Sequence, residues 1–252
     1  MTIQEAITAR HSVRTFTPEM PDGTVLDYVK EYAAGTEPVF AGTSCRLVLL
    51  EKAIDGKIGT YGIVRGAQCC VAVIHGRGAM DAVNAGMLGE RLVLGLTTRG
   101  MGTAWIGGTF SGSDIARATS PSPDETIAAI IPFGIPASKE SMVSRIISAM
   151  AGSKSRKPFD ELFSIAPDSP FRKGLELMRL APSAVNKQGW RAVEAGGNLH
   201  FFSADSSKFG MIDMGIGLEH FAVGAPAGVW KHMDCAALRP QWQYVVSWDV
   251  QR

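Results

Sequence analysis

One stretch of this 252-residue chain organises the interpretation of the rest: Leu180-Ala181-Pro182-Ser183-Ala184-Val185-Asn186-Lys187-Gln188-Gly189-Trp190-Arg191. It follows a helical pattern and precedes an extended one, so it predicts a turn from a helix into a strand. Its polar side chains are short, and the amides of Asn186 and Gln188 both donate and accept hydrogen bonds. Such groups match the carbonyls and ring nitrogens of a flat heteroaromatic ligand. A purely structural turn is the alternative, because Pro, Ser and Asn favour turns for backbone reasons alone.

The composition narrows the class of protein. The net charge is +1, so no global field favours nucleic acid or an acidic membrane surface as a partner. No apolar run reaches membrane-spanning length, and residues 1–5 are polar instead of opening a signal peptide, which predicts a cytoplasmic protein. The four cysteines and five histidines lack metal-ligand spacing, so no metal site is expected. A structural or surface role is expected for His220 and for every other histidine except His11.

The periodicity of apolar residues predicts a mixture of helices and strands. Thr2 followed by Glu5 is a capping box, which places a first helix at about residues 3–10. Residues 79–99 carry the strongest helical pattern. Further helices are expected from near 22 to 35, from Ser169-Pro170 to about 180, and in part of 206–224. Strands are expected at residues 45–50, 68–75, 103–106, 126–133, 190–194, 199–203 and 242–248, the last with one large apolar face.

The order helix, strand, long helix, strand occurs twice. It occurs in a first half at residues 1–140 and in a second half at residues 159–252, joined by a linker at 141–158. Residue identity between the halves is weak, so duplication is a hypothesis. Two such halves would each bury little alone and would pack as a pseudo-symmetric pair, like a two-fold dimer fused into one chain.

A basic segment near the N-terminus suggests an anion site. In the extended segment Arg10-His11-Ser12-Val13-Arg14, the side chains of Arg10, Ser12 and Arg14 face one side. Two guanidiniums and a hydroxyl on one side can hold a phosphate through charge-assisted hydrogen bonds. A solvated basic turn is the alternative, and Lys154 and Arg156 in the linker pose the same choice.

Taken together, five segments resemble the nitroreductase-like FMN-dependent oxidoreductases. Residues 10–16 resemble that family's N-terminal signature, and residues 181–191 its Ala-Pro-Ser-x-x-Asn-x-Gln-Pro-Trp segment, with Gly189 in place of the usual proline. Residues 100–108 resemble its Gly-Leu-Gly-x-x-Trp-Ile-Gly stretch, residues 133–136 its Gly-Tyr-Pro turn, and residues 154–158 the basic segment that follows. The resemblance implies an α+β fold of antiparallel-dominated sheets flanked by helices.

The order of these segments departs from ordinary members of the family. In those homodimers the Asn-x-Gln segment soon follows the basic one, and each FMN takes one segment from each chain. Here the first half carries a degenerate replacement at residues 33–46, and the intact segment lies in the second half. The resemblance therefore implies the internally duplicated, single-chain branch, with one intact flavin site and one lost. A monomer is expected, with a dimer left open.

The resemblance also implies the cofactor, the reaction and the site. FMN would take hydride from NAD(P)H and pass it to a nitroaromatic, a quinone or a related small acceptor. No catalytic side chain is expected, because flavin N5 carries the chemistry. A flavin-binding sensor or carrier without turnover is the alternative, and complete loss of FMN binding is a weaker third. The cofactor-binding residues implied are Arg10, His11, Ser12, Arg14, Ile106, Gly107, Gly108, Lys154, Arg156, Pro182, Ser183, Ala184, Asn186 and Gln188.

Overall fold

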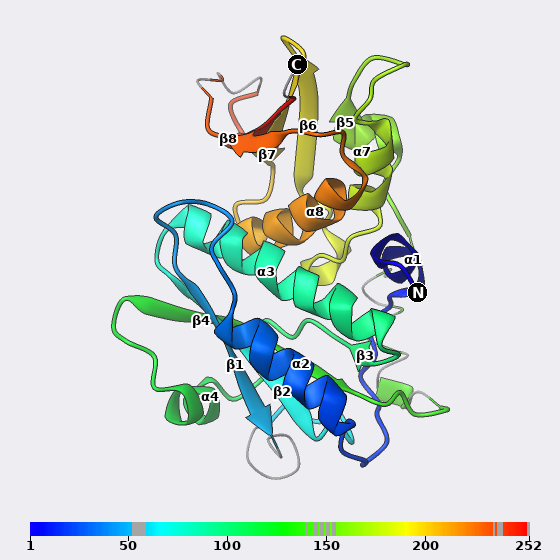
Figure 1. Cartoon of the computed structure of the whole chain (residues 1–252), viewed down its shortest axis with the longest axis vertical. Coiled ribbons are helices and arrows are strands. Elements are labelled where there is room, and N and C mark those ends of the chain that lie inside the picture. Colours follow the sequence, from blue (N-terminus) through cyan, green and yellow to red (C-terminus); the bar gives the residue numbers. More distant parts are fainter. Residues whose placement is uncertain are drawn as a thin grey trace.

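The computed structural model describes residues 1–51, 59–139, 141–143, 146, 149, 152, 155–233, 235 and 239–250. Two sheets lie at opposite ends of the molecule, and the long helices α3 (Ala79–Thr98) and α8 (Gly210–Gly224) pack against each other between them (Figure 1). All strand pairs but one are antiparallel in the described residues, so the predicted α+β class is confirmed. In the described part of the chain, no helix combines the length and the apolar character needed to span a membrane.

The first two helices form as the sequence predicts. Helix α1 (Ile3–Ala9) has the expected capping box, in which the Thr2 side chain accepts from Glu5 N at 3.2 Å and the Glu5 carboxylate accepts from Thr2 N at 2.8 Å. Helix α2 (Gly23–Ala34) is capped by Asp22, whose carboxylate accepts from Thr24 N at 2.8 Å. Side-chain oxygens therefore satisfy the amide groups that a helix start leaves without partners.

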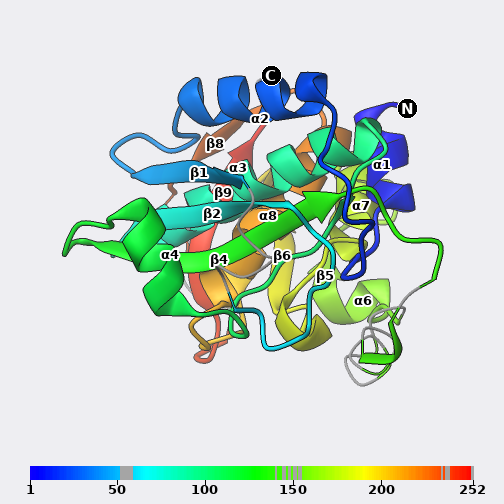
Figure 2. The same cartoon turned by 90° about the horizontal axis from the view of Figure 1, so that it is seen from below.

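The first half contains a four-stranded sheet in the order β1-β2-β4-β3. Its strands are β1 (Cys45–Glu51), β2 (Cys69–Gly76), β3 (Gly102–Thr103) and β4 (Glu125–Gly134). Helices α2 and α3 cover one face, while α4 (Gly112–Thr119) and the N-terminal segment cover the other, as Figure 2 shows for α2 and α4. Strand β2 is buried throughout because both of its faces are covered. Cys69 and Cys70 accordingly enter different cores.

The second half contains a five-stranded sheet in the order β5-β6-β7-β9-β8. Its strands are β5 (Phe163–Ser164), β6 (Trp190–Ala195), β7 (Asn198–Ser203), β8 (Val229–Lys231) and β9 (Gln243–Asp249), and its other helices are α6 (Phe159–Leu162) and α7 (Arg172–Arg179). The predicted strands β6 and β7 form a hairpin that turns at Gly196 and Gly197, with φ of 60° and 79°. Glycine adopts these left-handed angles without a steric penalty, which explains the Gly-Gly pair.

Three local predictions differ from the structure. The helix expected from Ser169 begins at Arg172, because the Ser169 hydroxyl accepts from Phe171 N at 3.2 Å in a preceding turn. The strand expected at 103–106 is reduced to β3. Strand β9 is buried on both faces instead of one, and its inward Ser247 is accommodated because its hydroxyl lies 2.7 Å from both His200 Nδ1 and Tyr244 OH. The sequence of the linker also allows a short helix at residues 142–150, and this range lies partly outside the described residues.

Helices α3 and α8 join the two halves, and glycines allow the two helices to approach each other closely. A Cβ atom on Gly86 would lie 2.2 Å from Ile212 O, and a Cβ on Gly215 would lie 2.0 Å from Val83 O. The contact is reciprocal, because each glycine faces the carbonyl three residues before the other glycine. In the second sheet, β6-β7-β9-β8 also repeats the chain order of β1-β2-β4-β3 in the first. Reciprocal contacts of this kind are typical of a two-fold interface.

Candidate functional site

The loop at residues 180–189 connects α7 to β6 in a strained conformation. It includes the short 3-10 turn η1 (Ala184–Asn186), and Val185, Asn186 and Gln188 have φ of 46°, 55° and 49°. Left-handed angles are uncommon for any residue with a side chain and are outliers for a β-branched one such as Val185. Such a backbone persists only where its surroundings fix it, and strain of this kind clusters at functional sites.

The two amide side chains of this loop hold the end of the linker. Asn186 Nδ2 donates to Gly152 O at 2.8 Å and to Ser155 O at 3.1 Å. Gln188 is almost completely buried, and its Oε1 accepts from Lys157 N at 2.9 Å. The loop therefore brings the basic segment around residue 156 against residues 186–188. Both regions belong to the predicted cofactor site.

Internal and helix contacts fix the start of the same loop. The Ser183 hydroxyl accepts from Gln188 N, and the Asp213 carboxylate of α8 accepts from Ala184 N, both at 2.9 Å. Burial raises the pKa of Asp213 to about 7, and the nearby Asp205 carboxylate acts in the same direction, while Lys187 acts against it. A backbone amide of the loop is thus held by a carboxyl group that titrates near neutral pH.

Arginine side chains from both halves gather next to the loop. Arg156 Nη2 donates to Leu180 O at 3.0 Å. Burial lowers the pKa of Arg156, and the positive charges of Arg10 and Arg179 lower it further. Arg10 from the N-terminal segment therefore lies near Arg156 and the second-half loop. Cations held together in a buried place repel one another, so an anion bound between them would be stabilised.

Arg10 provides the test of whether an anionic cofactor fits. Its side chain is 6% exposed, and its one ion pair within the described residues places Nε 3.8 Å from Glu90 Oε1. Burial lowers the pKa of Arg10, against the effect of Glu90. The described residues accept no hydrogen bond from this guanidinium, and its Nε is fully enclosed. Buried hydrogen-bond donors are rarely left without an acceptor, so the N–H groups of Arg10 fit a phosphate.

The basic segment also lies beside the stretch expected to face the flavin ring. Val13 N donates to Thr103 O at 2.8 Å, and Ser12 forms an isolated parallel bridge with Thr103. Beyond Thr103, Ile106 and Ile130 exchange backbone hydrogen bonds of 2.9 Å. The chain then enters Gly107 and Gly108, so residues 12 and 13 pair with β3 three residues before the 106–108 segment begins.

Two glycines show how this stretch meets the second half. A Cβ atom on Gly107 would lie 2.6 Å from Phe209 Cε1, so the Phe209 ring before α8 lies directly on Gly107. A Cβ on Gly189 would lie 2.6 Å from Asp205 Cβ. Asp205 is held by a 2.6 Å ion pair with Lys187, so it has little room to move. Packing against Asp205 therefore explains why glycine stands where the resembled family has proline.

The remaining predicted residues are His11, Arg14, Pro182 and Lys154. His11 is exposed, and its Nδ1 lies 3.3 Å from Ala9 O at the end of its own helix. Arg14 is half-buried, and its carbonyl accepts from Arg65 N at 2.9 Å. Pro182 is half-buried in the loop. Lys154 lies outside the described residues.

Sequence reasoning missed a buried polar cluster beside Arg10. Glu90 on α3 and His220 on α8 are completely buried, with Glu90 Oε1 2.8 Å from His220 Nε2. Trp105 Nε1 donates to the other Glu90 oxygen at 2.7 Å. A carboxylate inside the strongly apolar pattern of residues 79–99 was the available signal. A buried histidine agrees with the structural role expected for His220.

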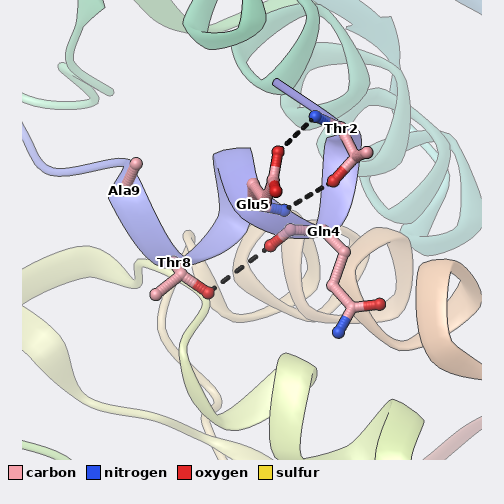
Figure 3. Close-up of a pocket in the computed structure, with 5 residues that line it drawn as sticks. All are labelled: Thr2, Gln4, Glu5, Thr8 and Ala9. Carbon is pink, nitrogen blue, oxygen red and sulfur yellow. Dashed lines mark hydrogen bonds between the residues drawn. The ribbon is translucent and has the colours of Figure 1, made fainter.

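A separate hollow on α1 is not part of this site. It is lined by Thr2, Gln4, Glu5, Thr8 and Ala9, none of which belongs to the predicted set (Figure 3). Its polar groups bond to one another, as Thr2 does with Glu5 and as Thr8 Oγ1 does with Gln4 O at 3.4 Å. These bonds stabilise the helix and leave little capacity for a ligand.

A family model described as "Putative TM nitroreductase" matches residues 2–225. The chain belongs to the nitroreductase family. The match covers the basic segment, the Trp105 stretch and the loop before β6, and it ends before β8 and β9. No curated protein sequence gives a significant match.

Solved structures agree with this nitroreductase fold. A "putative nitroreductase" from Thermotoga maritima matches with a TM-score of 0.67 at 23% identity, over 99% of this chain and 94% of that one. A nitroreductase family protein from Clostridium difficile has a TM-score of 0.49 at 16% identity, over 67% of this chain and 99% of that one. A "putative nitroreductase" in complex with FMN from Desulfovibrio desulfuricans has a TM-score of 0.47 at 21% identity, over 66% and 98% of the two chains.

Proposed function

We propose that this nitroreductase-family chain binds one FMN and uses it to transfer hydride from NAD(P)H to a nitroaromatic, quinone or related acceptor. The observation that carries the proposal is the Arg10 guanidinium. It is buried, its donors are not used by the described residues, and it lies near Arg156 beside the second-half loop. A phosphate would accept those donors and relieve the repulsion between the two cations.

Each side of the proposed site has a physical task. Arg10, Arg14 and Arg156 would hold the phosphate, with Ser12 and Lys154 beside them. Gly107 and Gly108 would allow close approach to the ring, because they carry no side chain. Bound FMN would supply the hydride chemistry itself. The remaining proposed contacts are His11, Ile106, Pro182, Ser183, Ala184, Asn186 and Gln188.

We also propose that the chain consists of two duplicated halves, at residues 1–140 and 159–252, joined by a linker at 141–158. We further propose that it works in the cytoplasm as a monomer. The repeated strand order and the reciprocal contacts of Gly86 and Gly215 support duplication. The proposed site takes Arg10 from the first half and the loop at 183–188 from the second. A single chain thus supplies both walls, as two chains do at a homodimer interface.

Flavin reduction tests the function. The FMN-loaded protein, mixed anaerobically with NADH or NADPH, is expected to lose its oxidised flavin absorption, and an added nitroaromatic or quinone is expected to restore it. Flavin that stays oxidised with both nucleotides would contradict an NAD(P)H oxidoreductase and favour a sensor or carrier. The Gly189 departure does not support that alternative, because packing against Asp205 accounts for it.

A further inference from the structure

Glu90 is a buried carboxylate that three side chains approach from separate parts of the fold. Its Oε2 accepts from Trp105 Nε1 at 2.7 Å, and its Oε1 lies 2.8 Å from His220 Nε2 and 3.8 Å from Arg10 Nε. The side chains of Glu90 and His220 have no exposed area. Leu177 O lies 3.1 Å from His220 Nδ1, and a carbonyl only accepts, so Nδ1 carries a proton. The Glu90 carboxylate is therefore held between Trp105 and His220.

We propose that Glu90 is a positioning residue that orients Arg10 toward the phosphate of the bound flavin nucleotide. This inference rests on the proposed function. Arg10 follows the end of α1 and has no other ion pair within the described residues, so Glu90 is the group that sets where its guanidinium lies. Trp105 and His220 in turn fix the carboxylate. The same carboxylate links the basic segment and the Trp105 stretch to helix α8.

The chain contains a matched control for this role. Gly86, Glu90 and Gly95 of α3 recur with the same spacing as Gly215, Glu219 and Gly224 of α8. Glu219 pairs across the same helix contact with Arg91, through two hydrogen bonds of 2.9 Å. Arg91 is 46% exposed, whereas every partner of the Glu90 cluster is buried or half-buried. Both carboxylates join α3 to α8, but only Glu90 approaches Arg10 among the described residues.

The experiment compares FMN with riboflavin, which lacks the phosphate. Dissociation constants of both are measured for the wild type, Glu90→Gln and Glu219→Gln. In Glu90→Gln the side-chain amide can still accept from Trp105, but the charge that holds Arg10 is lost. Glu90→Gln is expected to lower the preference for FMN over riboflavin about tenfold and to leave riboflavin affinity unchanged, while Glu219→Gln leaves the preference as in the wild type.

Three outcomes would overturn the proposal. The first is an unchanged preference for FMN over riboflavin in Glu90→Gln. The second is an increased preference in that variant, which would make Glu90 a counter-ion that competes with the phosphate. The third is an equal fall of the preference in Glu219→Gln, which would indicate a general effect of helix packing. A wild type that binds neither compound would instead contradict the proposed function. Should Glu90→Gln not fold, Glu90→Met, which is similar in length and carries no charge, replaces it, and a wild-type preference in that variant overturns the proposal.

A double-mutant cycle shows whether Glu90 acts through Arg10. In an Arg10→Ala background, Glu90→Gln is expected to cause no further change in the FMN preference. Additive losses from the two substitutions would mean that Glu90 acts by another route and would overturn the proposal.

Discussion

Arg10 combines burial, positive charge and donors that the described residues leave unused in one side chain. An arginine with 6% exposure is found mainly where a partner compensates its charge, and Glu90 at 3.8 Å from Nε compensates it in part. Phosphate oxygens are suitable partners for the remaining donors, because guanidinium and phosphate geometries match. The proposed cofactor site therefore depends most strongly on this residue.

Arg10→Ala is expected to weaken FMN binding about tenfold or more, because one charge-assisted hydrogen-bonding group contributes about 1.5–3 kcal/mol. Titration followed by flavin fluorescence measures the affinity. Arg117→Ala is the control, since the Arg117 side chain is 78% exposed and pairs with Asp114 on α4. An FMN affinity equal in Arg10→Ala and the wild type would remove Arg10 from the site.

Asp213 makes stability depend on pH. Burial raises its pKa from 3.8 to about 7, so the folded protein holds this proton more tightly than the unfolded chain does. The resulting stabilisation is complete below about pH 4 and is lost as the pH rises through about 7. Asp213→Asn keeps an acceptor for Ala184 N and cannot ionise. Its free energy of unfolding is expected to exceed that of the wild type by up to about 4 kcal/mol at about pH 8.

Urea unfolding of both proteins between about pH 4 and pH 8 measures this difference. The wild type is expected to lose stability relative to Asp213→Asn as the pH rises. Two curves that stay parallel across this range would show that Asp213 has an ordinary pKa.

At the scale of the elements, local sequence patterns predicted most of the fold. The Thr2 capping box depends on neighbouring residues only, and it forms as predicted. The Asp22 cap and the Gly-Gly turn are equally local. The predicted start of α7 was wrong because Ser169 forms a turn before the helix. The single buried face expected for β9 was wrong because burial of its other face depends on partners far along the chain. Ser247, for example, is buried through hydrogen bonds that involve His200, 47 positions away.

The candidate site, too, was predictable from the sequence only in part. Motif resemblance predicted the segments at 10–14, 106–108 and 181–191, and in the structure the first of them pairs with Thr103, three residues before the second. Spacing along the chain could not predict that Glu90 and His220 pair, because they lie on different helices. Nor could it predict the role of Gly189, which depends on how the loop packs against Asp205.

Gly189→Pro restores the residue that is usual in the resembled segment, yet it is expected to destabilise this protein. The added Cβ would lie 2.6 Å from Asp205 Cβ, and overpacking of this kind costs about 1–3 kcal/mol. Thermal unfolding measures the loss, and Asp205→Gly in the same chain is expected to restore part of it. A Gly189→Pro variant as stable as the wild type would disprove the packing explanation.

At the scale of the whole molecule, the two halves depend on the α3–α8 contact. Gly86→Ala would bring a Cβ to 2.2 Å from Ile212 O, a backbone atom in a packed helix. It is expected to lower the free energy of unfolding by about 3 kcal/mol. Gly112→Ala at the start of α4 is the control, because nothing lies within 4 Å of its added Cβ. Denaturant unfolding that gives equal stability for both variants would contradict this contact.

In the proposed arrangement the two halves together build one flavin site. Calorimetric titration of the flavin-depleted chain with FMN measures the number of sites through the stoichiometry. We expect saturation at one FMN per chain. Saturation at two per chain, or no binding at all, would contradict it.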